Sequence, residues 1–231
     1  MSIDPAEFTA RISGGLIVSC QAYPGEAMRD PNTMAQVARA AVTGGAVGIR
    51  LQGIDDIRAA ADLDVPVIGL WKDGADGVFI TPTLEHARAV ADAGAEVVAL
   101  DGTRRPRPDG LTLAETIAAL RETHDVLVMA DCGSLDDAIA AEAAGADLLG
   151  TTLAGYTGER PKTPGPDLEL VEQVAAHCTR PVIAEGRIHT PADAAAAVAA
   201  GATAVCVGTA ITHPSSITSW FVAALPEAVA R

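Results

Sequence analysis

Four segments of this chain repeat one pattern, in which a helical stretch stops at Gly-Ala and a short apolar run follows. The segments are TGGAVGIR, DAGAEVVAL, AAGADLLGT and AAGATAVCVG. Their glycines, Gly45, Gly94, Gly145 and Gly201, lie about 50 residues apart, which is the length of two strand–helix units. A period of this kind indicates a chain built from one supersecondary unit used many times.

Four more apolar runs lie among these segments, GLIVSC, VPVIGL, DVLVMA and PVIAE, and helical patterns fill the gaps. A strict alternation of strand and helix predicts a parallel sheet. Hydrophobic residues make up 49% of the chain and aromatic residues 3%, so the core consists of small aliphatic side chains that suit such a sheet. The predicted strands are Gly15–Cys20, Val47–Arg50, Pro66–Leu70, Glu96–Leu100, Val126–Ala130, Asp147–Gly150, Pro181–Ala184 and Ala204–Val207.

Eight strand–helix units in 231 residues predict an α/β fold of the closed kind, a (β/α)8 or TIM barrel, as a single domain over residues 1–231. An open, doubly wound sheet is the alternative, but it gives no reason for the regular double period. The segment Asp4–Ile12 predicts a short helix that covers the floor of the barrel.

The net charge of −14 argues against a nucleic acid partner, so an anionic substrate must be held locally by a few cations and backbone N–H groups. The four cysteines show no CxxC spacing, and we expect reduced thiols in a cytoplasmic protein. The N-terminus MSIDPAEF lacks the regions of a signal peptide. No run approaches the roughly 18 apolar residues of a transmembrane helix, so we expect no membrane partner.

Glycine turns follow the last two predicted strands and suggest a phosphate site. PVIA ends in Glu185-Gly186-Arg187, and AVCV ends in Gly208-Thr209. Glycine turns let backbone N–H groups approach an anion, and the loops after strands 7 and 8 of a barrel often hold a phosphate. The alternative is that these are ordinary turns, since any parallel sheet needs glycines. We predict phosphate binding at Gly186, Arg187, Gly208 and Thr209.

Polar residues just past each strand point toward the mouth of a barrel, which predicts a ring of candidate site residues. Thr103 and Thr151 are better explained as solvated strand ends. The candidates for substrate binding are Gln21, Arg50, Asp131, Thr152 and Tyr156, and the candidates for catalysis are Lys72 and Glu185.

Lys72 directly follows the apolar run VIGLW. Loss of solvent there would lower the pKa of its amine and make it a general base near neutral pH. An ion pair with Asp101 or Asp131 is the structural alternative. Glu185 follows apolar PVIA, and it is either an acid with a raised pKa or the ion-pair partner of Arg187 or Arg50.

Two long loops and the C-terminal segment complete the pattern. Two long loops follow predicted strands, Asp101–Gly110, which contains three arginines, and Thr151–Pro166. Because they follow strands, they belong on the catalytic face, where long loops are usually functional. Tolerated surface insertion is the alternative. An apolar stripe of Ile217, Trp220, Phe221, Ala224 and Leu225 predicts a helix that either forms a homodimer or packs on its own barrel.

These blocks together resemble one known family. LIVSCQAYPGEAM, GAVGIR, VFITPTL, ALDGTRRPRPDG, LVMADCGSLDDA, TTLAGYTG, PVIAEGRIHTPADA and VGTAITHP are similar to the N-acetylmannosamine-6-phosphate 2-epimerase family, in family order across nearly the whole chain. The resemblance implies a (β/α)8 barrel that interconverts N-acetylmannosamine 6-phosphate and N-acetylglucosamine 6-phosphate in sialic acid or amino-sugar catabolism. It implies neither a metal nor an organic cofactor.

The resemblance also assigns roles to single residues. It implies that Lys72 and Glu185 are catalytic and that Gln21, Arg50 and Asp131 contact the substrate. Two positions depart from the family pattern. Gly133 stands where a Ser or Thr side chain is expected, and Trp71 stands where a smaller aliphatic residue is usual. Because neighbouring strand residues face opposite ways, Trp71 should point away from the site if Lys72 points in.

Two other functions fit the residues alone. Lys72 could form a Schiff base with a phosphosugar in an aldolase. The barrel could also bind a phosphosugar without catalysis, because a fold does not by itself determine a function.

Overall fold

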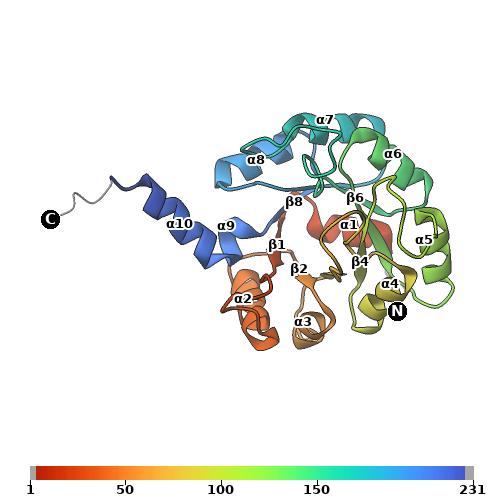
Figure 1. The fold of residues 1–231 in the computed structure, drawn as a ribbon, viewed down its shortest axis with the longest axis horizontal. Helices are drawn as coiled ribbons and strands as arrows, with labels where there is room; N and C mark the ends of the chain where they lie inside the picture. Colours follow the sequence, from red (N-terminus) through yellow and green to blue (C-terminus); the bar gives the residue numbers. More distant parts are fainter. Residues whose placement is uncertain (1–3, 227–231) are drawn as a thin grey trace.

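Eight parallel strands close into a barrel in the computed structural model, which describes residues 4–226 (Figure 1). The strands pair in chain order, and the last pairs with the first, which confirms the predicted (β/α)8 barrel. The strands are β1 (Leu16–Cys20), β2 (Gly48–Gln52), β3 (Val67–Leu70), β4 (Val97–Asp101), β5 (Leu127–Asp131), β6 (Leu148–Gly150), β7 (Val182–Glu185) and β8 (Ala204–Val207). Their bounds lie within two residues of those predicted.

Helices surround the barrel on its outside (Figure 1). Several begin at a capping residue that the sequence supplies. Thr112 and Thr190 each form a capping box, in which the side chain accepts from a backbone N–H and an acid three residues later reciprocates. The helices are α1 (Pro5–Ile12), α2 (Pro31–Thr43), α3 (Ile54–Ala59), α4 (Leu84–Asp92), α5 (Leu113–Arg121), α6 (Leu135–Ala143), α7 (Leu168–His177), α8 (Pro191–Ala199), α9 (Thr209–Thr212) and α10 (Pro214–Ala224).

The repeated Gly-Ala sites end helices as predicted. Gly45, Gly94, Gly145 and Gly201 have φ values of 100°, 103°, 99° and 104°, a backbone conformation that residues with a side chain rarely adopt. Each of these glycines turns the chain from a helix into the next strand. The internal period of the sequence is therefore a period of helix ends.

The floor of the barrel is closed by α1, as the sequence predicted. Phe8 and Ile12 are buried, and they join a cluster with Ile17 of β1, Ile68 of β3 and Leu148 of β6. These inward residues are apolar at the floor, whereas the inward residues nearer the other end of the strands are polar. The change from apolar to polar side chains places the functional site at the carboxyl end of the strands.

The helix α10 does not pack on its own barrel. It extends away from the other helices in Figure 1, and none of its residues is buried. Trp220 contacts the ring of His189 at a centroid distance of 4.7 Å, but Phe221 remains 72% exposed. Of the two alternatives for the apolar stripe, packing on its own barrel is not observed, because the chain after α9 turns outward. Within residues 4–226, no helix combines the length and apolar character needed to cross a bilayer.

Candidate active site

A cavity of about 610 Å³ opens at the carboxyl end of the strands. Polar and charged side chains from several strands line it, in contrast to the apolar floor below. Two half-exposed tyrosines, Tyr23 and Tyr156, stand on its wall, one from the loop after β1 and the other from the loop after β6. The residues predicted from the sequence that line the cavity are Gln21, Arg50, Lys72, Thr152, Tyr156, Glu185, Gly186, Arg187, Gly208 and Thr209.

A folded-back loop fixes the position of Lys72. The chain after β3 returns on itself, so that Lys72 forms an antiparallel bridge with Ile80. The amide of Asp73 donates to the Phe79 carbonyl at 3.0 Å, and the amide of Thr81 donates to the Trp71 carbonyl at 2.7 Å. These bonds hold the backbone of Lys72 on both sides. Trp71 points away from the cavity, as predicted, and its ring packs against His86.

Lys72 has no carboxylate partner within the described residues. Its Nζ donates to Oε1 of Gln21 at 2.7 Å, and the predicted alternative of an ion pair with Asp101 or Asp131 is not observed. Burial lowers the pKa of the Lys72 amine from its ordinary value, and the positive charge of Arg50 lowers it further. The carboxylates around Arg50 act in the opposite direction without reversing the shift. An amine of this kind is suited to accept a proton.

Arg50 joins two carboxylates beneath the cavity. It is 1% exposed, and its Nη1 and Nη2 donate to the two oxygens of Asp131 at 3.0 and 2.6 Å. Nη1 also donates to Oε2 of Glu185 at 2.6 Å. Thr152 adds a hydroxyl that lies 2.6 Å from Asp131 and 3.2 Å from Glu185. Glu185 is therefore the partner of Arg50 and not of Arg187.

The pKa values in this cluster shift in directions that matter for proton transfer. Burial alone would lower the pKa of Arg50, but the charges of Asp131 and Glu185 outweigh it and raise that pKa, so the guanidinium stays charged. Burial raises the pKa of the Glu185 carboxyl, and the charge of Arg50 compensates only in part. Glu185 is thus an acid that holds its proton to a higher pH than an ordinary glutamate.

Asp131 lies behind Arg50 and does not line the cavity. Its side chain is 0% exposed, and both oxygens are occupied by Arg50 and Thr152. Its burial separates it from the cavity, so the direct contact with a substrate that the sequence predicts stays a prediction. In this arrangement Asp131 acts on the site by holding Arg50 and Thr152 in place.

Backbone N–H groups of two turns face the cavity without acceptors. Within residues 4–226, the amides of Gly186, Arg187, Gly208 and Thr209 donate to no protein acceptor, although all four residues line the cavity. Gly186 and Arg187 have φ values of 113° and 55°, so successive N–H groups can point to one side. Free N–H groups gathered in this way form an anion-binding concavity.

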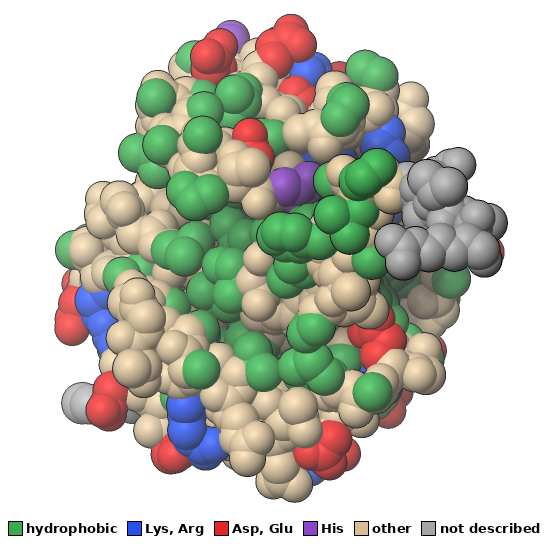
Figure 2. Space-filling view, turned by 90° about the vertical axis from the view of Figure 1, so that its left-hand side faces the viewer, with side chains coloured by type: hydrophobic (Ala, Val, Ile, Leu, Met, Phe, Trp, Pro, Cys, Tyr) green, Lys and Arg blue, Asp and Glu red, His purple; other side chains and the backbone are tan. Residues whose placement is uncertain are grey.

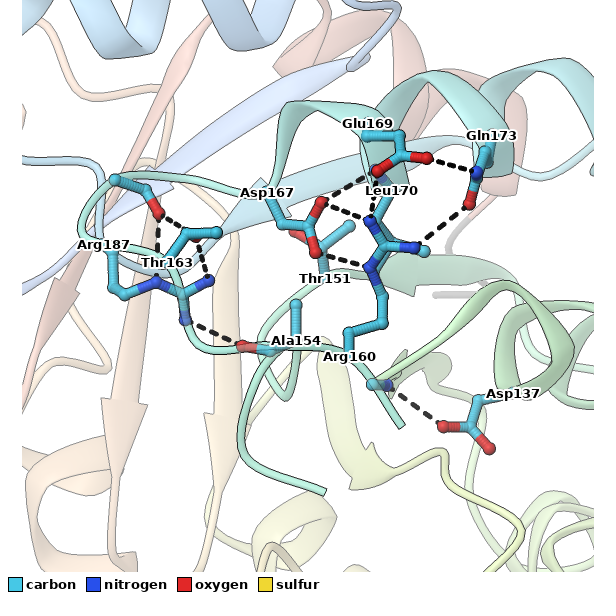
Figure 3. A network of polar contacts seen from close by, with 12 residues as sticks. Asp137, Thr151, Ala154, Arg160, Thr163, Asp167, Glu169, Leu170, Gln173 and Arg187 are labelled. Atoms are coloured by element: carbon cyan, nitrogen blue, oxygen red, sulfur yellow. Dashed lines mark hydrogen bonds and ion pairs between the residues drawn. The ribbon is translucent and has the colours of Figure 1, made fainter. Parts of the chain in front are cut away.

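The side chain of Arg187 joins this turn to the long loop after β6 (Figure 3). Its guanidinium donates to the carbonyls of Ala154 and Gly165 at 2.7 and 3.0 Å and to Oγ1 of Thr163 at 3.2 Å. Residues 4–226 use three of its five N–H groups, and the other two are suited to bind an anion. Arg160 holds the same loop further from the cavity through a two-bond contact with Asp167 (Figure 3).

The arginines of the loop Asp101–Gly110 hold the loop and do not line the cavity. Arg104 pairs with Asp137 and Glu159, and Arg105 pairs with Asp101. Arg107 is buried, and it donates to the carbonyls of Asp101 and Thr81. The concentration of positive charge in this loop therefore has a structural explanation.

Gly133, the departure from the family pattern, does not leave a gap. A Cβ at this position would lie 2.5 Å from Oγ1 of Thr157, so the Thr157 side chain occupies the space. Gly133 does not line the cavity. The loops after β5 and β6 thus pack together here, with the Thr157 side chain against Gly133.

Several polar residues on the cavity wall were not predicted from the sequence, among them Ser19, Arg29 and Cys206. Ser19 and Cys206 are inward residues of β1 and β8, and Arg29 lies in the loop after β1. The alternation of strand residues could have identified Ser19, because Ile17, Ser19 and Gln21 share one face of β1. Among the described residues, no group of three or more His, Cys, Asp or Glu side chains is arranged to hold a metal ion.

The fold is a (β/α)8 barrel, and its cavity brings together an amine, a buried carboxyl group and backbone amides, an arrangement suited to acid–base chemistry on an anionic substrate. Comparison with known proteins is more specific. A family model described as "Putative N-acetylmannosamine-6-phosphate epimerase" matches residues 34–227. A relative from Cutibacterium acnes, named "Putative N-acetylmannosamine-6-phosphate 2-epimerase", is 63% identical over 215 residues, which is 92% of this chain and 94% of that protein.

A solved structure gives the same result. The N-acetylmannosamine-6-phosphate 2-epimerase from Clostridium perfringens superposes with a TM-score of 0.90 at 37% identity, covering 94% of this chain and 96% of that one. A thiamine phosphate pyrophosphorylase from Pyrococcus furiosus, at 19% identity and a TM-score of 0.60, shares the fold alone. The chain belongs to the N-acetylmannosamine-6-phosphate 2-epimerase family.

Proposed function

We propose that this protein interconverts N-acetylmannosamine 6-phosphate and N-acetylglucosamine 6-phosphate by moving a proton at C2. The observation that carries the proposal is the pair at the cavity, a buried glutamate and a lysine that has no carboxylate partner in residues 4–226, beside amides that these residues leave unbonded and that suit a phosphate. Family membership supplies the substrate class.

The reaction requires a base and an acid. The C2 proton of the open-chain sugar is acidic because it lies next to the C1 aldehyde. Its removal gives an enolate, and return of a proton to the opposite face gives the epimer. General acid–base help of this kind contributes about 10²–10⁴-fold. The remainder comes from positioning and from stabilising the enolate charge.

Lys72 and Glu185 meet this requirement through their opposite pKa shifts. A lowered lysine pKa and a raised glutamate pKa both favour the uncharged forms. In that state Lys72 is an amine that accepts the C2 proton, and Glu185 is a carboxylic acid that donates one. Arg50 lines the cavity and keeps its positive charge, so it is suited to stabilise the enolate. We assign sugar contacts to Gln21, Thr152 and Tyr156.

The phosphate is assigned to the turns at Gly186–Arg187 and Gly208–Thr209. Arg187→Ala should raise the KM for the 6-phosphate about 10- to 100-fold, the loss of a charged hydrogen bond. The KM for unphosphorylated N-acetylmannosamine should change little. Steady-state kinetics with both sugars measures the difference.

Arg160→Ala is the matched control, because Arg160 holds the same loop but does not line the cavity. Loosening of the loop would affect both sugars alike in this variant. If Arg187→Ala impairs the two sugars equally, Arg187 does not bind the phosphate.

A second copy of the chain is the proposed macromolecular partner. An apolar groove of about 450 Å³ runs between α8 and the outer faces of β8 and β1. Figure 2 shows apolar side chains gathered in a hollow on this side of the molecule. In a (β/α)8 barrel a helix after the last strand covers this position, but α10 points outward instead. We propose that α10 of a second copy lies in the groove.

Sedimentation tests this dimer from both sides. The wild type should run as a dimer, and both Phe221→Glu on α10 and Val198→Glu in the groove should run as monomers, because each buries a charge in an apolar contact. Ser219→Glu, on the opposite face of α10, should leave the dimer intact. A monomeric wild type would exclude the dimer, and a dimeric Val198→Glu would exclude the groove.

We propose that residues 1–231 act as one catalytic domain in the cytoplasm, in sialic acid or amino-sugar catabolism, without a metal or organic cofactor. The four free thiols, three of them buried, support a reducing compartment. The chemistry needs only a base, an acid and donors for the enolate, which the chain supplies.

Incubation with N-acetylmannosamine 6-phosphate tests the activity against the alternatives. An epimerase yields N-acetylglucosamine 6-phosphate and no smaller fragment. An aldolase would release a cleaved sugar, and borohydride would trap its adduct on Lys72. A barrel that only binds would show no conversion.

A further inference from the structure

Ser19 is a buried polar residue on the cavity wall to which the proposed reaction assigns no role. It lies on β1 between Ile17 and Gln21, and the three side chains face the inside of the barrel. Ser19 is 4% exposed. Oγ of Ser19 accepts a hydrogen bond from Nε2 of Gln21 at 2.6 Å.

This bond determines which end of the Gln21 amide faces the lysine. Because Nε2 donates to Ser19, Oε1 turns toward Lys72 and accepts from Nζ at 2.7 Å. A reversed amide would place two donors against each other. An amine that donates one hydrogen to Oε1 has its lone pair restricted to the two remaining tetrahedral positions. Ser19 therefore orients Lys72 through Gln21.

Ser19 also lies against the proposed phosphate turn. A Cβ on Gly208 would lie 3.3 Å from Cβ and 3.7 Å from Oγ of Ser19. Oγ1 of Thr212 donates to the Ser19 carbonyl at 2.8 Å and lies 3.2 Å from the Gly208 carbonyl, which fixes the strand to the turn. Ser19 and Gly208 are thus held as one rigid unit at the cavity wall.

The hydroxyl hydrogen of Ser19 is free for a ligand. Among the described residues, Oγ accepts from Gln21 but donates to no protein acceptor. The N–H groups of Gly208 and Thr209 beside it also have no acceptor in the part of the chain that the structure describes. An anion held by these amides places an oxygen next to the Ser19 hydroxyl, which can then donate to it.

We propose that Ser19 is a positioning residue that couples phosphate binding to the catalytic lysine. A phosphate oxygen accepts from Ser19, Ser19 accepts from Gln21, and Gln21 accepts from Lys72. Hydrogen bonds in such a chain strengthen one another. The phosphate then raises the rate of C2 proton transfer and does not serve only as a handle for affinity. The inference rests on the proposed function, since it assumes the phosphate site and the role of Lys72.

The coupling can be tested by supplying the sugar and the anion as two separate molecules. Unphosphorylated N-acetylmannosamine is incubated in D2O with and without inorganic phosphite, and deuterium at C2 is measured. Phosphite should accelerate exchange by the wild type. In Ser19→Ala, the acceleration by phosphite should be about tenfold smaller than in the wild type, which is the effect of one hydrogen bond. The kcat of this variant with the 6-phosphate should also fall about tenfold. Ser13→Ala, an exposed serine near the floor, should behave as the wild type.

Each outcome has a distinct meaning. Failure of the wild type to exchange C2 of the 6-phosphate overturns the proposed function itself. A wild type that phosphite does not activate, or a Ser19→Ala variant activated as strongly as the wild type, overturns the coupling alone. If Ser19→Ala lowers the rate of C2 exchange equally with and without phosphite, Ser19 only holds Gln21, and the coupling is overturned as well. Ser19→Cys, which keeps the shape with a weaker donor, provides the same comparison if Ser19→Ala does not fold.

Discussion

Lys72→Met is expected to lower C2 proton exchange by at least about 10²-fold while phosphosugar binding persists. Methionine keeps the approximate length of the side chain and removes the amine. The phosphate turns and the cluster around Arg50 stay as they are, so calorimetry should still detect binding of N-acetylmannosamine 6-phosphate. Exchange in D2O, followed by the loss of the C2 proton signal, measures the effect.

Lys162→Met is the matched control, because Lys162 is the other lysine of the chain and lies over the ring of Tyr156 outside the cavity lining. This variant should exchange at close to the wild-type rate. A Lys72→Met variant that exchanges the C2 proton as fast as the wild type would contradict the proposed mechanism.

Arg50→Met is expected to destabilise the fold by about 3–5 kcal/mol at neutral pH, because it leaves buried carboxylates without their cation. Asp131 is fully buried and Glu185 is 12% exposed, so water compensates little for the lost charge. Urea unfolding measures the difference. Arg58→Met, which breaks an exposed contact of 3.8 Å with Asp55, should cost less than about 1 kcal/mol.

The destabilisation of Arg50→Met should shrink as the pH falls. Burial already raises the pKa of Glu185 in the wild type, and loss of Arg50 raises it further. The folded state then binds more protons than the unfolded state, so its stability increases as the pH falls through the raised pKa. A destabilisation that grows toward acidic pH would contradict this account of the cluster.

The fold could be predicted because the helix ends and the apolar strand runs in the sequence both indicate the same closed barrel. Helix ends at Gly45, Gly94, Gly145 and Gly201 need a positive φ, which glycine adopts readily. The apolar runs are short, and alternating with helices they leave a closed parallel sheet as the natural arrangement. The predicted strand bounds differ from the observed ones by one or two residues, because the apolar pattern and the hydrogen bonding of a strand do not end at the same residue.

The pairing of the site residues could not be predicted in the same way. Arg50 and Glu185 are 135 positions apart in the sequence, and only the closed barrel brings them to 2.6 Å. The same closure places Asp131 behind Arg50 and away from the cavity. Position after a strand identifies a candidate, but side-chain length and the neighbouring charges determine which candidates reach the cavity.

The outward direction of α10 also could not be predicted from the sequence. An apolar stripe on a helix indicates burial, but it does not say against which surface. The exposed stripe and the open groove beside α8 become visible together only in the folded chain. The arginines of the loop after β4 are a similar case, because their partners come from distant parts of the chain.

The most direct test of the central claim is turnover of N-acetylmannosamine 6-phosphate in D2O, with the product analysed by NMR. The proton that Glu185 delivers to C2 comes from the solvent, so N-acetylglucosamine 6-phosphate should carry deuterium at C2 and at no other carbon. Conversion to N-acetylglucosamine 6-phosphate without deuterium at C2, or release of a cleaved fragment, would contradict proton transfer by Lys72 and Glu185.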